Sequence, residues 1–203
     1  SYAMVQVAPG RMLIASFDNL ICEVFTNSGE ARFIETPDEE WKYNVRHAVL
    51  NPTCLFLDSA GDVWLGTVGN GLFRHDHTLR RTRPVEGAFC PDICSIQEDQ
   101  QGNIWISTQN GLCRYDRTIG DVTLFSERDG IGGDQFYNAS SCALPDGTLV
   151  FGGTHGLTFF NPLDIQRKYA GKLVFEDLRI HNELVYPSPD GPIATELVRQ
   201  PDS

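Results

Sequence analysis

The 203-residue sequence lacks several features that define common classes of protein. Its longest uninterrupted apolar stretches are only a few residues, such as Met12–Ala15. A membrane span needs about 20 such residues, so we expect no part of this chain to be inserted in a membrane. No basic stretch followed by an apolar region opens the chain, which predicts no signal peptide in this sequence. Ser1–Ala3 precede Met4 and look like a tag scar left by cloning.

Basic charge is also scarce. The chain has 16 Lys and Arg against 27 Asp and Glu, a net charge of −11. Because nucleic acids are held by cationic contacts to phosphate, this balance opposes nucleic acid as a partner. The metalloprotease, nucleophile-elbow and phosphate-loop signatures are all missing. The sequence therefore offers no catalytic residues, and it predicts neither a bound metal nor a cofactor.

The cysteines form no Cys-x-x-Cys pair. The chain is long enough to fold without a disulfide framework. Cys90 and Cys94 flank a Pro-Asp turn. Two cysteines at this spacing are a weak signature of a metal site, and the geometry of a disulfide between them is uncertain. Most of the others fall in expected strand interiors, where a thiol behaves as a small apolar side chain. We interpret all six as structural thiols: Cys22, Cys54, Cys90, Cys94, Cys113 and Cys142.

A repeat is the main signal in the chain. Its clearest copies begin at Asp58, at Asp99 and at Asp146, and a degenerate copy begins at Gly10. Each copy has a glycine in a turn, then an apolar run, and a second glycine or asparagine nine or ten residues after the first. The anchoring glycines are 51, 41 and 45 residues apart: Gly10, Gly61, Gly102 and Gly147.

A period of about 40–50 residues with several short strands per unit is typical of β-propeller blades. The Asp-x-x-Gly and Pro-Asp-Gly segments are hairpin turns, in which glycine supplies positive φ. The run that follows, such as Ile104–Ile106, is apolar on both faces and is therefore covered on both sides. Residues 53–57, 93–97 and 138–143 supply the first strand of each following blade, and 122–125 closes one. The fold class is all-β, a partial propeller of about four blades of four-stranded antiparallel sheet.

Trp64 and Trp105 have two interpretations. Tryptophan often stacks on sugar rings, so a carbohydrate platform is conceivable. Both side chains recur at one position of the repeat, however, where Leu13 and Val150 stand in the other copies. Replacement by aliphatic residues suits packing between blades better than contact with a ligand.

The domain boundaries follow from where the repeat stops. Residues 4–162 form blades, the C-terminal part of a larger propeller, and 163–172 form a polar connector. Residues 173–203 begin with alternating apolar and polar positions, which predict two short strands around a turn at His181–Glu183. We interpret them as the opening strands of a truncated β-sandwich domain. Uncovered blade flanks would be large apolar surfaces, so we expect a homo-oligomer.

The repeat in 98–116 closely resembles the two-component regulator propeller repeat. Residues 129–162 resemble the last blade of that family's second propeller, and the strand pair in 173–185 resembles the start of its three-tyrosine, immunoglobulin-like domain. The resemblance implies a periplasmic sensor region of a Bacteroides-type hybrid two-component system histidine kinase/response regulator. Such receptors recognise oligosaccharides released from glycans. It implies further blades and an immunoglobulin-like domain of the same parent chain as partners. Kinase and receiver domains are absent here, so the chain is not itself an enzyme.

Candidate ligand-binding residues come from the loops. Those between the second and third strands of a blade, and those between successive blades, emerge at one end of a propeller. They carry amides, acids and an imidazole, which suit a hydroxyl-rich ligand. Each residue could instead satisfy its own turn. The candidates are Asn70, Gln109, Asn110, His155, Asp92, Asp134, Gln135 and Asn138.

Two alternatives to a sensor remain. A propeller enzyme such as a lyase, lactonase or glycosidase needs paired carboxylates or a metal cluster near the central axis. The only paired imidazoles, His75 and His77, sit past a third strand, where we expect them to face solvent. A protein-interaction scaffold is the other alternative, and sequence alone does not separate it from sugar sensing.

Overall fold

A computed structural model describes most of the chain. The described residues are 3–16, 21–34, 51–76, 81–87, 90–165, 179–180 and 183–184. The chain divides into two compact units, residues 1–165 and residues 166–203. In the second unit β16 (Arg179–Ile180) pairs with β17 (Glu183–Leu184), both within the region where two short strands were predicted. The rest of the predicted sandwich segment lies outside the described residues, so that domain stays a prediction.

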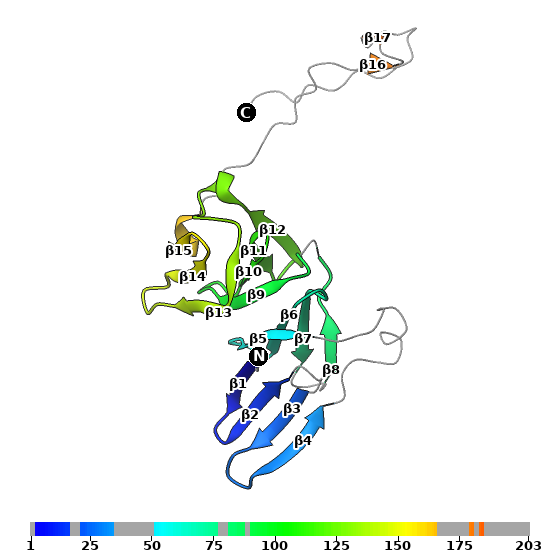
Figure 1. Cartoon of the computed structure of the whole chain (residues 1–203), viewed down its shortest axis with the longest axis vertical. Coiled ribbons are helices and arrows are strands. Elements are labelled where there is room, and N and C mark those ends of the chain that lie inside the picture. The colour runs from blue at the N-terminus through cyan, green and yellow to red at the C-terminus, as the bar shows by residue number, and fades with distance from the viewer. Residues whose placement is uncertain are drawn as a thin grey trace. The chain divides into compact units, whose positions relative to one another are not determined.

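The first unit consists of antiparallel sheets in which each strand pairs with the next in sequence (Figure 1). We number them as blades 1 to 4. Blade 1 contains β1 (Ala3–Ala8), β2 (Arg11–Ala15), β3 (Ile21–Phe25) and β4 (Glu30–Ile34). Blade 2 contains β5 (Pro52–Leu57), β6 (Val63–Thr67), β7 (Leu72–Asp76) and β8 (Arg81–Pro84). Blade 3 contains β9 (Ile93–Glu98), β10 (Ile104–Thr108), β11 (Gly111–Asp116) and β12 (Asp121–Phe125). Blade 4 contains β13 (Phe136–Ala143), β14 (Leu149–Gly153) and β15 (Gly156–Phe160).

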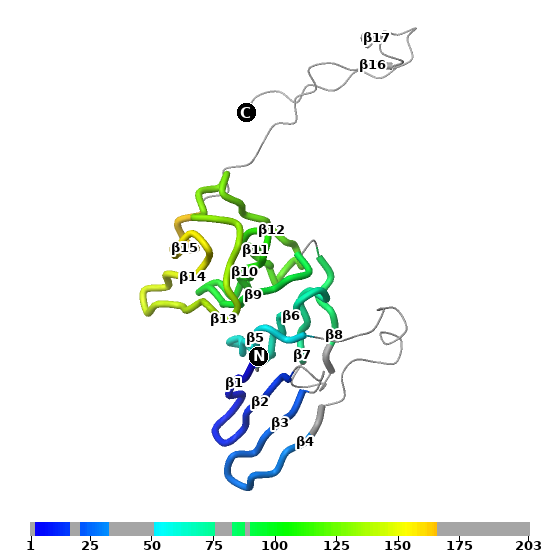
Figure 2. Tube along the Cα trace, viewed as in Figure 1, coloured from blue at the N-terminus to red at the C-terminus, as the bar shows by residue number. Residues whose placement is uncertain are grey.

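The blades fan around a shared axis, as the repeat predicted. The first strands of consecutive blades contact one another in the order β1, β5, β9 and β13, and β13 also reaches β5. The trace in Figure 2 shows the successive blades following one another along the first unit. Two short 3-10 helices, Glu127–Asp129 and Pro162–Asp164, flank blade 4. Blade 4 differs from the predicted four strands, because the described residues give it three.

The turns between the first and second strands form as the repeat predicts. Gly61 has φ 92° and Gly102 has φ 81°, a backbone conformation that glycine adopts without strain. Oδ1 of Asp58 accepts hydrogen bonds from the backbone N–H groups of Ala60 and Asp62, both at 2.9 Å. Asp99 makes the same pair of bonds in blade 3. The aspartate thus closes the turn that the glycine makes possible.

The hydrophobic core lies between the blades. Leu13 and Ile21 of blade 1 pack with Leu65 and Phe73 of blade 2. Trp64 packs between blades 2 and 3, and Trp105 packs between blades 3 and 4. The buried cluster around Trp64 contains Cys54, Trp64, Leu72, Ile93, Ile96, Ile104, Ile106 and Cys113. The buried cluster around Trp105 contains Cys94, Trp105, Leu112, Phe136, Leu149 and Phe151. Trp64 is 1% exposed and Trp105 0%, which makes both indoles part of the core.

Each buried indole also has a polar partner. Nε1 of Trp64 donates to Oδ2 of Asp58 at 2.7 Å, and Nε1 of Trp105 donates to Oδ2 of Asp99 at 2.8 Å. Sequence inspection identified these aspartates only as turn residues. One carboxylate therefore accepts hydrogen bonds both from the backbone N–H groups of the turn and from the indole N–H of the ring that packs between the blades.

The cysteines are unpaired thiols. Cys54, Cys94 and Cys113 are buried, whereas Cys142 is exposed. Burial raises the pKa of Cys54 and Cys113 to about 12 and that of Cys94 to about 11. A thiol with a raised pKa stays protonated at neutral pH and reacts slowly with electrophiles.

We therefore expect selective alkylation of the folded chain. With iodoacetamide at pH 8, Cys142 should react first, because it is exposed, while Cys54, Cys94 and Cys113 should stay unmodified until denaturant is added. Peptide mass spectrometry over a time course measures this order. Modification of the three buried thiols as fast as Cys142 would contradict the packing between blades.

The bond between Asp99 and Trp105 predicts non-additive stability. Asp99→Leu leaves the indole N–H and two turn N–H groups unpaired, which should cost about 3 kcal/mol of unfolding free energy. The double variant Asp99→Leu with Trp105→Val reproduces the residues of blade 4 at these positions. Its loss should be about 1–2 kcal/mol smaller than the sum of the single losses.

Urea denaturation of the four proteins measures that coupling. Asp116→Ala is the matched control, because Asp116 caps an exposed turn at Thr118 and contacts no indole. It should lose less stability than Asp99→Leu. Strictly additive losses would mean that the carboxylate and the indole act independently.

Candidate functional site

The loops that carry the candidate residues meet at one end of the blades. The loop between the second and third strands of a blade is hydrogen-bonded to the segment that leads into the same blade. In blade 3, Gln109 N–H donates to the carbonyl of Asp92 at 3.2 Å. In blade 4, Thr154 N–H donates to the carbonyl of Gln135 at 3.0 Å. The same loop reaches the following blade, where Gly111 N–H donates to the carbonyl of Asp134 at 2.6 Å. The predicted grouping of these two kinds of loop is therefore present in the structure.

Four of the candidate side chains have polar partners within or between these loops. Oδ1 of Asp92 accepts from Gly69 N–H at 2.9 Å, and Oδ1 of Asp134 accepts from Glu127 N–H at 2.9 Å. Gln109 donates from Nε2 to the carbonyl of Phe136 at 2.9 Å and so joins blade 3 to blade 4. Nδ1 of His155 lies 3.1 Å from Thr154 Oγ1. One polar atom of each of these side chains is therefore engaged inside the protein.

Three amides point to the surface without an internal partner. Asn110, Gln135 and Asn138 are exposed, and their side chains make no hydrogen bond to any residue that the structure describes. Asn70 is half-buried and already has an interaction of its own. Sequence inspection missed Tyr137, which is 57% exposed between Phe136 and Asn138. Its signal was an aromatic ring between two amides in the Gln135–Asn138 segment.

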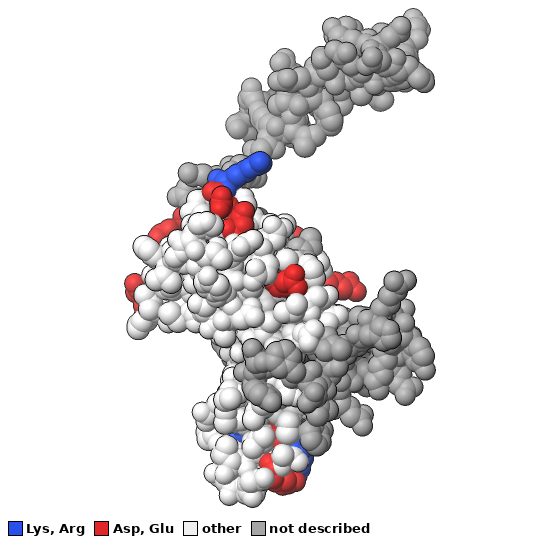
Figure 3. Space-filling model, in the orientation of Figure 1, with Lys and Arg blue, Asp and Glu red and all other residues white. Residues whose placement is uncertain are grey.

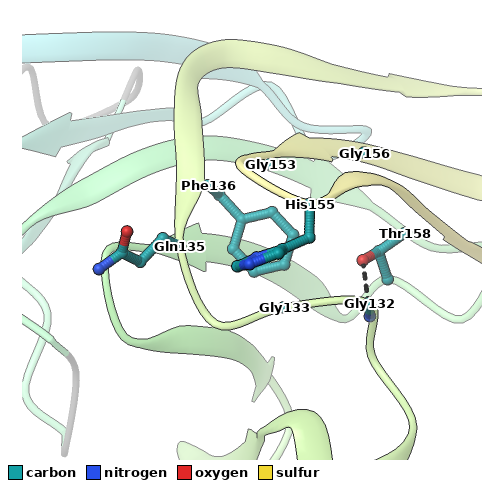
Figure 4. A pocket seen from close by; sticks show the side chains of 8 residues that line it. All are labelled: Gly132, Gly133, Gln135, Phe136, Gly153, His155, Gly156 and Thr158. Atoms are coloured by element: carbon teal, nitrogen blue, oxygen red, sulfur yellow. Dashed lines mark hydrogen bonds between the residues drawn. The ribbon is translucent and has the colours of Figure 1, made fainter.

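Blade 4 carries a small hollow at this end (Figure 4). Its volume of about 10 Å³ is roughly that of one water. Figure 4 shows the rings of His155 and Phe136 among the groups that line the hollow, and Gly132 N–H donates to Thr158 Oγ1 at 3.2 Å. The hollow suits a water or a single hydroxyl group rather than a sugar ring. Its lining residues are Gly132, Gly133, Gln135, Phe136, Gly153, His155, Gly156 and Thr158.

The surface charge of the first unit reflects the excess of acidic over basic residues in the sequence. In the view of Figure 3, Asp and Glu side chains are scattered over the first unit and Lys and Arg side chains are few. Asp92 and Asp134 add acidic groups beside the loops. This surface disfavours sulfated or phosphorylated ligands.

The structure adds little to the case for an enzyme. His75 lies within β7 and is buried, at 8% exposure, so the expectation that it faces solvent was wrong. It lies on the same face of blade 2 as Val63 and Phe73, which packs against blade 1. His77 lies outside the described residues. Within the described part of the chain, no group of three or more His, Cys, Asp or Glu residues could hold a metal ion. Among the same residues, no helix has the length and hydropathy of a membrane span.

Comparison with known proteins agrees with the repeat. A family model described as "Two component regulator propeller" matches residues 89–110, which confirms the predicted type of repeat. A curated protein named "Histidine kinase P4", from Formosa agariphila, is 30% identical over 111 residues. That match covers 54% of this chain and 8% of the relative.

Solved structures share the fold. The extracellular domain of a putative hybrid two-component system from B. thetaiotaomicron superposes with a TM-score of 0.66 at 21% identity, over 92% of this chain and 26% of that one. Virginiamycin B lyase from Staphylococcus aureus superposes with a TM-score of 0.57 at 14% identity, over 81% of this chain and 56% of that one. Identities this low establish the propeller fold alone. This chain spans about a quarter of the B. thetaiotaomicron domain and less than a tenth of the curated relative.

Proposed function

We propose that this chain is a ligand-sensing part of the extracytoplasmic region of a hybrid two-component receptor. The ligand is an oligosaccharide without sulfate or phosphate groups. The repeat type, the histidine kinase relative and the extracellular neighbour support the receptor context. In that context the kinase chemistry belongs to other domains of the parent chain, and this propeller segment acts by binding.

The observation that carries the proposal is the set of unpartnered amides at the loop end. Asn110, Gln135 and Asn138 each present a donor and an acceptor to solvent, which matches the hydroxyl groups of a sugar. Tyr137 adds an exposed ring whose face can cover the apolar side of a pyranose. Amides and an aromatic ring together are the chemistry of a neutral carbohydrate site.

The loops that present these groups are rigidly supported. Gln109 and Gly111 of blade 3 both bond to backbone atoms of the segment that leads into blade 4. A ligand that contacts Asn110 on one blade and Asn138 on the other would bridge these two blades in addition to the bonds that already join them. We propose that this is how occupancy reaches the immunoglobulin-like domain that we expect to follow the propeller.

Calorimetric titration of this chain with a panel of neutral and sulfated oligosaccharides tests the function. Saturable heat with at least one neutral oligosaccharide, with the sugar recovered unchanged, supports a sensor. Recovery of cleaved or rearranged sugar would instead support a propeller enzyme. No binding heat with any oligosaccharide of the panel, together with binding heat from a protein partner, would support an interaction scaffold.

The same titration, repeated with variants, tests which side chains contribute to binding of the oligosaccharide. Asn110→Ala, Gln135→Ala and Asn138→Ala should each weaken binding about 5- to 10-fold, as expected for the loss of one hydrogen bond. Gln100→Ala is the matched control, since Gln100 is an exposed amide on the turn at the opposite end of β10. It should bind like the unaltered chain. Equal affinities for all five proteins would move the site away from these loops.

A further inference from the structure

The hollow in blade 4 lies on the side of the blade that faces blade 3. Its walls come from the segment that leads into β13, from β13 itself, and from β14, β15 and the turn between them. Phe136 belongs to the cluster that packs between blades 3 and 4, and Thr158 is the cross-strand neighbour of Phe151 in the same cluster. Cross-strand neighbours share one face of a sheet. The hollow is therefore shaped by blades that are both present in the structure.

Polar groups and one apolar ring line this hollow. Oγ1 of Thr158 accepts from Gly132 N–H, so its hydroxyl hydrogen can donate to a further group. Gly133 is buried, and among the described residues none accepts a hydrogen bond from its N–H. The ring of Phe136, which is 1% exposed, supplies the apolar wall. A buried N–H without an acceptor is rare, so this donor indicates an oxygen atom from outside the chain.

The hollow stays open because residue 133 has no side chain. A Cβ atom at Gly133 would lie 2.7 Å from Nδ1 of His155 and 3.3 Å from Cβ of the same residue. Even an alanine would therefore displace the His155 side chain. The volume of about 10 Å³ accommodates one water-sized group. A single hydroxyl group is thus the largest polar group that fits.

The candidate amides lie next to the hollow. Gln135 is one of its lining residues. Asn110 precedes Gly111, whose N–H donates to the carbonyl of Asp134, the residue between Gly133 and Gln135. A sugar bound by these two amides would therefore lie over the hollow.

The size of the hollow selects one part of such a sugar. Secondary hydroxyl groups are attached directly to ring carbons, so the ring itself limits how far they can enter. The primary hydroxyl of a hexopyranose stands one methylene group beyond the ring and can reach deeper. Its oxygen can accept from Gly133 N–H and from the Thr158 hydroxyl, while its methylene group lies against the Phe136 ring.

We infer that the hollow receives the hydroxymethyl group of a hexopyranose, so that the ligand is an oligosaccharide built from hexoses. The inference rests on the proposed function, because it names the sugar that the loop amides hold. A pentose has no group to place in the hollow and makes none of these contacts. A 6-deoxy sugar places a methyl group there, which leaves Gly133 N–H without a partner.

Calorimetric titration with matched sugars tests the inference. The hexose-built probes are cello-, malto- and manno-oligosaccharides, and the pentose-built probes are xylo- and arabino-oligosaccharides of the same length. Cello- and xylo-oligosaccharides share linkage and ring stereochemistry and differ only in the hydroxymethyl group. At least one hexose-built probe should bind about 10-fold more tightly than every pentose-built probe, as expected for one hydrogen-bonded group.

Variants of the hollow should change the ratio of the two affinities. Thr158→Val keeps the shape of the side chain but removes the hydroxyl, and Gly133→Ala closes the hollow. Each should weaken binding of the hexose-built probe about 10-fold and leave binding of the pentose-built probe unchanged. Thr158→Ser keeps the hydroxyl and should bind like the unaltered chain. Thr148→Val is the matched control, because Thr148 is a half-buried threonine at the opposite end of β14 from the hollow.

The outcomes separate this inference from the proposed function. Equal affinity for both kinds of probe, or a preference for pentoses, would overturn the inference and leave a sugar sensor whose hollow holds only water. An equal loss of both affinities in Thr158→Val would overturn it too, because the threonine would then act only by shaping the loop. Binding to none of the probes would overturn the proposed function, and the inference with it.

Discussion

The bond between a buried carboxylate and a buried indole supports the rest of this structure. Asp58 and Asp99 each close a turn with one oxygen and hold a tryptophan ring with the other. Where the indole is replaced the carboxylate is replaced too: Val7 and Leu13 in blade 1, and Leu144 and Val150 in blade 4. A buried carboxylate without donors is costly, so the two positions change together.

The rings then link one blade to the next. Trp64 meets Tyr115 of blade 3 edge-on with centroids 5.7 Å apart, and Trp105 meets Phe160 of blade 4 at 4.8 Å. At the turn end, Arg117 of blade 3 reaches Asp58 of blade 2 at 3.0 Å and Glu98 at 3.2 Å. At the loop end, backbone hydrogen bonds join the same blades. The interface between blades 2 and 3 is thus fixed at both ends, and that between blades 3 and 4 is joined at the loop end, where the exposed amides lie.

Sequence reasoning succeeded where the repeat exposed the physics. Glycines that recur at the same place in each copy of the repeat predicted the turns, and aliphatic replacement of Trp64 and Trp105 predicted core packing rather than a sugar platform. It failed where a side chain is used by a distant backbone atom. The bond from Gly69 N–H to Asp92 and that from Gln109 to the Phe136 carbonyl join different blades. No spacing rule separates these engaged residues from Asn110 and Asn138, and the burial of His75 within β7 was equally invisible.

Hydrogen exchange of the two indole N–H groups, followed by nuclear magnetic resonance, tests this account most directly. Each proton is buried between two blades and bonded to a carboxylate. Both should therefore exchange as slowly as the most protected backbone amides, through global unfolding alone. Exchange of either proton at the rate of a solvent-exposed indole would contradict the claim that the aspartate–tryptophan pairs hold the blades together.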